Sequence, residues 1–149
     1  MLATTTLAYY SGDDPVNLPW LSVGAVGFVS VIGHVVADRL RAMLDAYNAG
    51  EQDRARKLHY AMLPVIRAMG RVGGAVFAKT ALRLRGLDVG STRLPLPPAT
   101  DDQVAAIAGD LAVAGVALDS SAHPSSHLPG HGALGSRTPT DLGAEVAYR

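Results

Sequence analysis

The sequence contains no cysteine, only two lysines and few aromatic side chains. The absence of cysteine excludes a disulfide framework, a thiolate nucleophile and a cysteine-based zinc site. Acidic and basic residues are equal in number, so the net charge of zero gives no indication of nucleic acid as a partner. The 149 residues suffice for one domain with a modest core. Because the N-terminus lacks the basic residues of a signal peptide, we expect a cytoplasmic protein.

Acidic and basic residues are also absent between residues 15 and 37. An uncharged apolar stretch of about 20 residues has the length of a membrane span. Pro19, Gly24 and Gly27 interrupt the stretch, and buried parallel strands also form continuous apolar runs. A pair of buried strands and a membrane span therefore both fit the composition, and we favour the strands and expect no membrane.

Two short apolar runs, Leu7–Tyr10 and Phe28–Val31, are rich in aromatic and β-branched residues. Both are too short for helices and are followed or preceded by glycine, which is typical of buried strands. A polar turn, Gly12-Asp13-Asp14, and a short apolar segment separate them. This order predicts a strand–helix–strand unit whose strands are parallel.

Helical periodicity dominates the rest of the chain as far as Gly115. A stripe of Val36, Leu40, Met43 and Tyr47 predicts a helix over residues 35–48 that Gly50 ends. Pro64 predicts a kink or a break in the next helix because proline removes a hydrogen-bond donor. Thr100 and Gln103 form a predicted capping box. The predicted helices after the first span residues 51–72, 75–85 and 100–115.

Several polar residues are candidates for chemistry. Asp13 and Asp14 could serve as paired carboxylates, but we favour helix capping because aspartate is a preferred N-cap. Ser11, Ser30 and His34 could supply a nucleophile and a base, yet no Gly-x-Ser-x-Gly motif accompanies them, so a triad is not expected. We interpret His34 as a hydrogen-bonded turn residue.

The segment 119–149 is dense in Ser, Pro, Gly and Thr, and we expect it to be disordered. His123, His127 and His131 recur every four residues in it, a spacing that could bind zinc or copper on a helix. Pro124 and Gly130 disfavour a helix there, so no metal site is predicted.

Five motifs, taken in order, resemble the 4-hydroxy-tetrahydrodipicolinate synthase family of pyruvate-dependent aldolases. The first two resemble the seventh and eighth strands of the family's barrel and their surroundings, and the others resemble its C-terminal helices. In chain order they are Tyr10-Ser-Gly-Asp-Asp14, Gly27-Phe-Val-Ser-Val31, Leu58-His-x-x-Met-Leu-Pro64, Lys79 with Leu82-x-Leu-x-Gly-Leu87, and Arg93-Leu-Pro95 with Pro98 and Thr100-x-x-Gln103.

The resemblance implies an α/β fold: the last two βα units of a TIM barrel over residues 1–48, then a helical domain over residues 49–118. It implies a carbon–oxygen lyase that condenses pyruvate, held as a lysine-bound enamine, with aspartate semialdehyde in lysine biosynthesis. No cofactor is implied. The full-length family is typically a homotetramer, and pyruvate is its small-molecule partner.

The resemblance also places the Schiff-base lysine and the catalytic tyrosine on earlier strands, so no catalytic residue is assigned within this chain. Lys57, Lys79, Tyr9 and Tyr10 do not match those positions. Two positions do match the pyruvate pocket, and both act through the backbone: the carbonyl of Val29 and the glycine Gly12. We therefore expect the chain alone to be inactive.

Two alternatives remain open from the sequence. The chain could be a non-catalytic helical oligomerisation module, or it could belong to a related pyruvate aldolase that uses another aldehyde.

Overall fold

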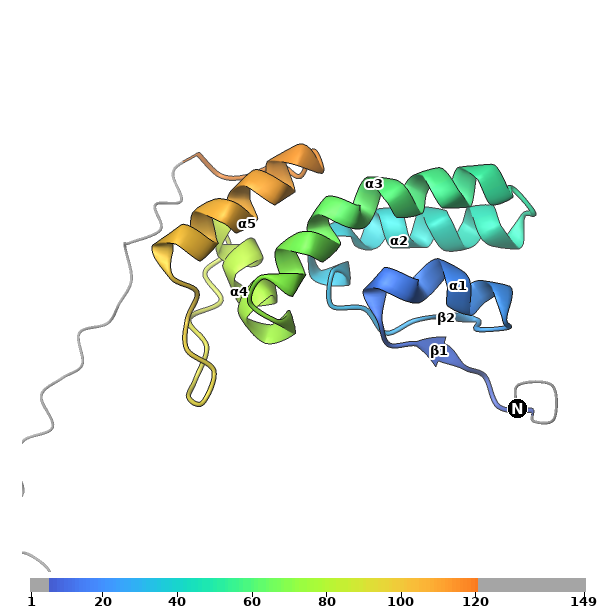
Figure 1. Ribbon diagram of the computed structural model, residues 1–149, viewed down its shortest axis with the longest axis horizontal. Helices are drawn as coiled ribbons and strands as arrows, with labels where there is room; N and C mark the ends of the chain where they lie inside the picture. Colours follow the sequence, from blue (N-terminus) through green and yellow to red (C-terminus); the bar gives the residue numbers. More distant parts are fainter. Residues whose placement is uncertain (1–5, 121–149) are drawn as a thin grey trace, which may run out of the picture.

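The computed structural model describes residues 6–120, which are mostly helical with two short strands (Figure 1). The segment expected to be disordered and its histidines, His123, His127 and His131, lie almost wholly outside the described residues. In chain order the elements are β1 (Tyr10–Ser11), the 3-10 turn η2 (Asp14–Val16), α1 (Asn17–Ser22), β2 (Gly27–Phe28), α2 (Gly33–Asn48), α3 (Gln52–Gly70), α4 (Gly74–Leu84) and α5 (Asp101–Val113).

The two strands pair in parallel, as predicted, with Tyr10 opposite Gly27 and Ser11 opposite Phe28. Their predicted bounds were wrong, because each strand is only two residues long. The second strand ends early since the amides of Val31 and Ile32 donate to the side chain of Asp14 and not to a neighbouring strand. The strand pair is thus held at its end by a side chain.

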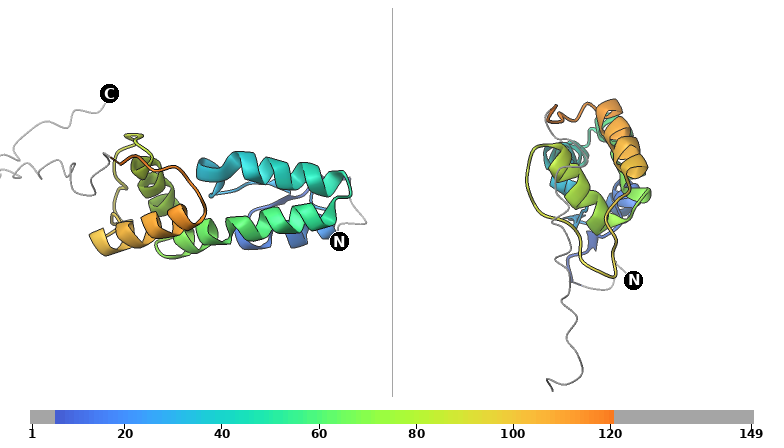
Figure 2. Two further views of the ribbon diagram at one scale, coloured as in Figure 1. Left: turned by 90° about the horizontal axis from the view of Figure 1, so that it is seen from above. Right: turned by 90° about the vertical axis from the view of Figure 1, so that its left-hand side faces the viewer.

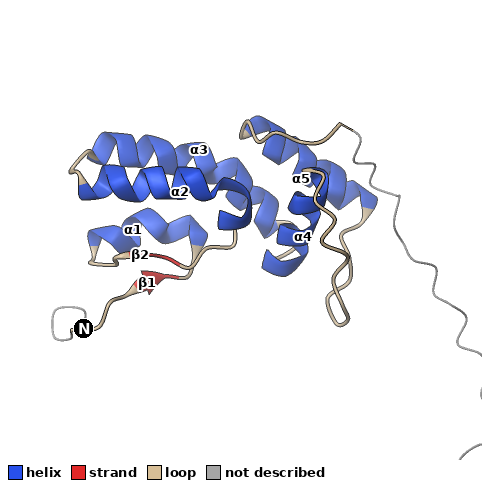
Figure 3. Cartoon of the chain, turned by 180° about the vertical axis from the view of Figure 1, so that it is seen from behind, coloured by secondary structure: helices blue, strands red, loops and turns tan. Residues whose placement is uncertain are grey.

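The short helix α1 connects the strands and lies between them and the helix pair α2–α3 in the views of Figures 1 and 3. Leu21 is its buried apolar side chain, while Trp20 and Val23 are 42% and 55% exposed. Phe28 of β2 packs against the main core. The opposite side of the sheet is open, and Tyr10 there is 60% exposed.

Helices α2 and α3 run side by side and in opposite directions (Figure 2). The predicted stripe of α2 is confirmed: Val36, Leu40 and Met43 are buried and Tyr47 is half-buried. The chain reverses at Gly50, whose φ of +79° is one that residues with a side chain rarely adopt. The two helices therefore pack along one apolar face of each.

The predicted break at Pro64 is absent, because α3 is one continuous helix from Gln52 to Gly70. Proline leaves the carbonyl one turn earlier, that of Tyr60, without its helical donor. Tyr60 is 58% exposed, so solvent can satisfy that carbonyl. The helix is thereby long enough to pack on α2 with its first half and on α4 and α5 with its second.

Arginines of α3 and α2 hold the C-terminal half of α5 at two places, Asp110 and the carbonyls just after the helix. The Asp110 carboxylate, 6% exposed, receives Arg67 at 2.7 Å and Arg71 at 2.7 Å from α3. These arginines lower the pKa of Asp110, with the Arg71 hydrogen bond as the largest cause. Arg39 of α2 donates to the Ala114 carbonyl at 2.5 Å and the Gly115 carbonyl at 3.2 Å. At the N-terminus of α5, the predicted Thr100–Gln103 capping box is confirmed.

Within residues 6–120, no single helix has the length and apolar character needed to cross a membrane. Only α3 and α4 taken together pass that test of length and composition, and they are bent by 110° relative to one another. The uncharged segment 15–37 forms η2, α1, β2 and the start of α2 rather than one helix.

One buried histidine generates a prediction about acid stability. His59 of α3 is 7% exposed, its Nδ1 has no hydrogen-bond partner in the described chain, and burial lowers its pKa. Since the unfolded chain binds this proton more readily, the free energy of unfolding should fall as the pH drops below 6.5, the ordinary pKa of histidine. Urea unfolding at pH 7.5 and pH 5.5 measures the loss, which His59→Leu should reduce.

The matched control is His34→Gln, because the side chain of His34 is exposed. It should keep the wild-type difference between the two pH values. An equal reduction in both variants would contradict the assignment to His59.

Candidate functional site

The two predicted pocket positions, Gly12 and Val29, lie at the same edge of the sheet. Each follows the last residue of its strand, and the register of Ser11 with Phe28 makes them the next pair of neighbours. The Val29 amide donates to the Ser11 carbonyl at 2.7 Å, which joins the two strand ends directly. This edge is where the carboxyl ends of parallel strands meet, the usual position of active sites in α/β barrels.

The backbone at this edge is open. Gly12 has no atom within 4 Å of the position that a Cβ would occupy, apart from its chain neighbours. Val29 is 71% exposed, and no residue between 6 and 120 donates a hydrogen bond to its carbonyl. A free carbonyl beside an unobstructed glycine can accept a hydrogen bond from a small ligand held against the strand ends.

The prediction that Asp13 and Asp14 cap a helix is confirmed for their positions at the start of η2, but no side-chain capping bond is formed. Asp13 occupies the N-cap position of η2 but makes no capping bond with its side chain. Asp14 is buried and reaches across to the loop after β2, where it accepts hydrogen bonds from the amides of Val31 at 2.9 Å and Ile32 at 3.0 Å. The two carboxylates therefore have different surroundings and do not act as a pair.

The serines and His34 do not form a triad. Ser30 Oγ donates to Asp14 and accepts from the Gly33 amide at 3.0 Å, so its hydroxyl is fully engaged. Ser11 Oγ donates to the Asp13 carbonyl at 3.3 Å. His34 lies in the first turn of α2 and not in a turn before it; its amide donates to the Val31 carbonyl at 3.2 Å, and its side chain is exposed.

Neither lysine is placed as a buried nucleophile. Lys57 is exposed on α3, as predicted. Lys79 of α4 donates from Nζ to the Val89 carbonyl at 2.8 Å and so anchors the loop that follows α4. Tyr10 covers Gly27 with its ring, and Tyr9 is half-buried beside it in the chain.

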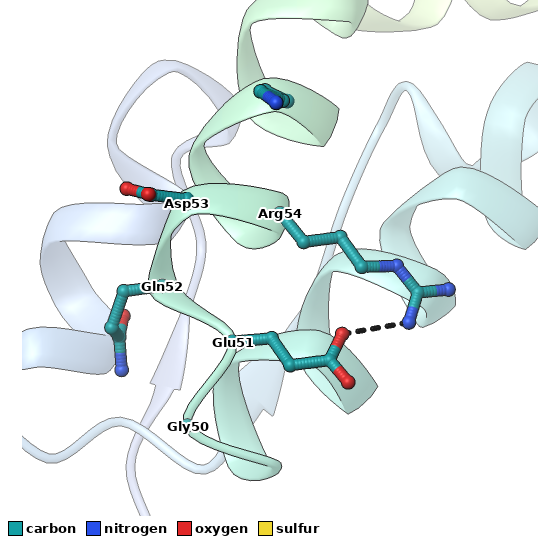
Figure 4. Close-up of a pocket in the computed structure, with 6 residues that line it drawn as sticks. Gly50, Glu51, Gln52, Asp53 and Arg54 are labelled. Carbon is teal, nitrogen blue, oxygen red and sulfur yellow. Dashed lines mark hydrogen bonds and ion pairs between the residues drawn. The ribbon is translucent and has the colours of Figure 1, made fainter.

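A depression at the turn between α2 and α3 is lined mainly by charged and polar residues at the start of α3 (Figure 4). Two ion pairs involve its lining residues, Arg54 with Glu51 at 2.8 Å and Arg56 with Asp53 at 2.8 Å. The lining residues are Gly50, Glu51, Gln52, Asp53, Arg54 and Lys57. No group of three or more metal-binding side chains occurs in the part of the chain that the structure describes.

Sequence reasoning missed two side-chain hydrogen bonds to Asp14. The Ser30 hydroxyl donates one, and Asn17 Nδ2 donates the other at 3.1 Å. The available signal was position: Asp14 follows the first predicted strand, Ser30 lies near the C-terminal end of the second, and the carboxyl ends of parallel strands meet at one edge. Pairing them required the register, which the sequence did not provide.

The dihydrodipicolinate synthetase family matches residues 1–114. Similar curated proteins include the 4-hydroxy-tetrahydrodipicolinate synthases of Mycolicibacterium paratuberculosis, 50% identical, and Mycobacterium leprae, 51% identical, each over 116 residues. The synthase of Corynebacterium urealyticum is 52% identical over 116 residues. These matches cover 78% of this chain, which spans 39% of the length of each relative.

Solved structures give the same result. A dihydrodipicolinate synthase from Cyanidioschyzon merolae, crystallised with lysine bound, superposes with a TM-score of 0.71 at 34% identity. That match covers 74% of this chain and 37% of the other. A dihydrodipicolinate synthase from Bacillus anthracis superposes with a TM-score of 0.67 at 41% identity over 70% of this chain and 36% of its own. The partial barrel and helical extension expected from the motifs are confirmed.

The geometry separates a glycine that faces open space from one that the fold requires. Gly12→Ala should leave the free energy of unfolding unchanged or raise it by about 0.4–1 kcal/mol, because it has room and restricts the unfolded chain. Gly50→Ala should lower it by about 1–2 kcal/mol, because the φ of +79° at Gly50 is strained for a residue with a side chain. Urea unfolding of both variants measures the difference, and a destabilised Gly12→Ala would contradict the open site.

Proposed function

The chain belongs to the dihydrodipicolinate synthetase family, and on this premise we propose that it supplies one wall of the pyruvate site of a barrel aldolase. The proposed reaction is the condensation of pyruvate with aspartate semialdehyde, as in 4-hydroxy-tetrahydrodipicolinate synthases. In this assignment β1 and β2 are the last two strands of the barrel. Residues 1–48 then form its final βα units, and residues 49–118 form the helical domain.

The observation that carries the proposal is the open backbone edge at Gly12 and Val29, in a chain about half identical to synthases of this type. The Val29 carbonyl has no donor among the described residues and can accept a hydrogen bond from the bound keto acid or its enamine. Gly12 has no atom within 4 Å of the position that a Cβ would occupy, so its backbone leaves the strand end accessible to a ligand. Both contributions use main-chain atoms, so they depend on position more than on side-chain chemistry.

The amine that forms the Schiff base comes, in this proposal, from another segment of the barrel. A lysine nucleophile must be desolvated enough to lose its proton near neutral pH. Lys57 is exposed, and Lys79 is engaged with the Val89 carbonyl on the helical side. Neither lies at the strand ends, so this chain binds and orients the substrate while the nucleophile is contributed elsewhere.

We also propose that the complete barrel self-associates, as the resemblance implies. Trp20 of α1 and Val23 just after it remain 42% and 55% exposed, which is compatible with a contact to a further subunit. Light scattering of the assembled protein tests this, and a monomer at micromolar concentration would count against it.

Supplying the rest of the barrel tests the proposed function. The segment of the Mycobacterium leprae synthase that precedes its match to this chain would be co-expressed with residues 1–149. We expect a complex that condenses pyruvate with aspartate semialdehyde. Each strand of this chain is unpaired on one side, and the strands of the other segment would pair there. The matched control is the same pair carrying Gly12→Val, which fills the open space and should lower activity about 10-fold or more. A stable but inactive wild-type complex would refute the proposal.

Trapping by reduction locates the nucleophile. After incubation with pyruvate and borohydride, this chain by itself should gain no pyruvate-derived mass, since neither lysine is poised to form an imine. In the co-expressed complex the mass gain should fall entirely on the complementing segment. Intact mass spectrometry distinguishes the two chains, and a stoichiometric adduct on Lys57 or Lys79 would overturn the assignment.

A further inference from the structure

Asp14 is a buried carboxylate whose two oxygens are both occupied by donors from the protein. It is 4% exposed and lies two residues beyond Gly12. The Val31 and Ile32 amides donate to Oδ2 at 2.9 Å and 3.0 Å, while the Ser30 hydroxyl and Asn17 Nδ2 donate to Oδ1, the latter at 3.1 Å. No cationic side chain in the described chain pairs with it. The carboxylate is thus held entirely by hydrogen bonds with directional geometry.

These donors belong to the residues that follow Val29 directly. Three consecutive residues, Ser30 to Ile32, bind the one carboxylate. Val29 is the direct neighbour of Ser30, and Gly12 is two residues before Asp14. The hydrogen bonds of the Asp14 carboxylate therefore connect the backbone at Gly12 with the backbone at Val29. The hydrogen bond from the Val29 amide to the Ser11 carbonyl is a second connection between the same two segments.

Ser30 extends the link to the following helix. Its hydroxyl donates to Asp14 and accepts from the Gly33 amide at 3.0 Å, the first residue of α2. The backbone after β2 is therefore fixed on both sides: β1 holds its beginning, and Asp14 with the start of α2 holds its end. The carbonyls of Val31 and Ile32 accept hydrogen bonds from the first turn of α2, whereas the Val29 carbonyl, like that of Ser30, has no donor among residues 6–120.

We propose that Asp14, acting with Ser30, is a positioning residue that sets the direction of the Val29 carbonyl relative to Gly12. This inference rests on the proposed function, which assigns those two backbone positions to the pyruvate pocket. Asp14 does not touch the ligand in this view. Fixing the direction of the Val29 carbonyl matters because a carbonyl acceptor contributes to binding only within narrow limits of distance and angle.

The decisive variant is Asp14→Asn, which keeps the size of the side chain but turns one oxygen into a donor that faces other donors. Ser30→Ala is the second variant, and it retains both backbone hydrogen bonds to Asp14. Asp13→Asn is the matched control, because it makes the same change of charge one residue away, where the side chain forms no capping bond.

The first readout is the carbonyl ¹³C chemical shift of Val29 in this chain, measured with the amide shifts of Ile107 and Leu111 in the distant core of α5. Asp14→Asn should move the Val29 signal and leave the α5 signals in place, with a smaller change in Ser30→Ala and none in Asp13→Asn. A Val29 signal unchanged in Asp14→Asn, or moved equally in Asp13→Asn, would overturn the proposal. If Asp14→Asn fails to fold, the same comparison between Ser30→Ala and Asp13→Asn decides it.

The second readout uses the co-expressed complex and separates this inference from the proposed function. Asp14→Asn should raise the KM for pyruvate about 10-fold while kcat changes less, because it weakens orientation and not the nucleophile. An unchanged KM would refute the positioning role. A wild-type complex without activity would refute the proposed function, while the Val29 chemical shift would still decide whether Asp14 positions that carbonyl.

Discussion

The hydrogen bonds of the Asp14 carboxylate hold the strand end of this molecule together. Two strands of two residues each offer few backbone hydrogen bonds, and such a pair has little stability by itself. The Asp14 carboxylate accepts four further hydrogen bonds, from Asn17 of α1 and from the residues between β2 and α2, Ser30, Val31 and Ile32. Each hydrogen bond to a charged group contributes about 1.5–3 kcal/mol, enough to offset the burial of one carboxylate. The strands, α1 and α2 consequently keep one relative arrangement.

The helices depend on α3 in a similar way. Its first half packs on α2, and its second half carries Arg67 and Arg71, which hold Asp110 of α5. Arg39 of α2 then binds the carbonyls at the end of α5, so three helices are connected in a closed cycle of contacts. The apolar core runs through this cycle, with Met62 and Val65 of α3 next to Ile107 and Leu111 in one cluster. The helical part can therefore keep its shape while the sheet stays open.

The open sheet explains why function is assigned to a larger assembly. The chain spans 39% of the length of its curated relatives, and its sheet has two strands, each paired on one side only within the described residues. Tyr10 at 60% exposure and Val29 at 71% lie on or beside the uncovered side of that sheet. Apolar groups at unpaired strand edges favour the addition of further strands. A barrel closed by such strands would enclose the same edge where Gly12 and Val29 meet.

The sequence by itself determined the secondary-structure order, the helix periodicity, the Thr100–Gln103 capping box and the family, because these depend on local spacing and on motifs in order. The assignment of Gly12 and Val29 to a pyruvate pocket comes from the resemblance and stays a proposal. The sequence could not determine where the strands end, whether Pro64 breaks α3, or what Asp14 binds. Those outcomes depend on partners distant in the chain: three of the four donors to Asp14 lie 16 to 18 residues away, and the parallel register brings them within reach. Tertiary structure decided them because a buried carboxylate must satisfy its oxygens with whichever donors the fold places within reach.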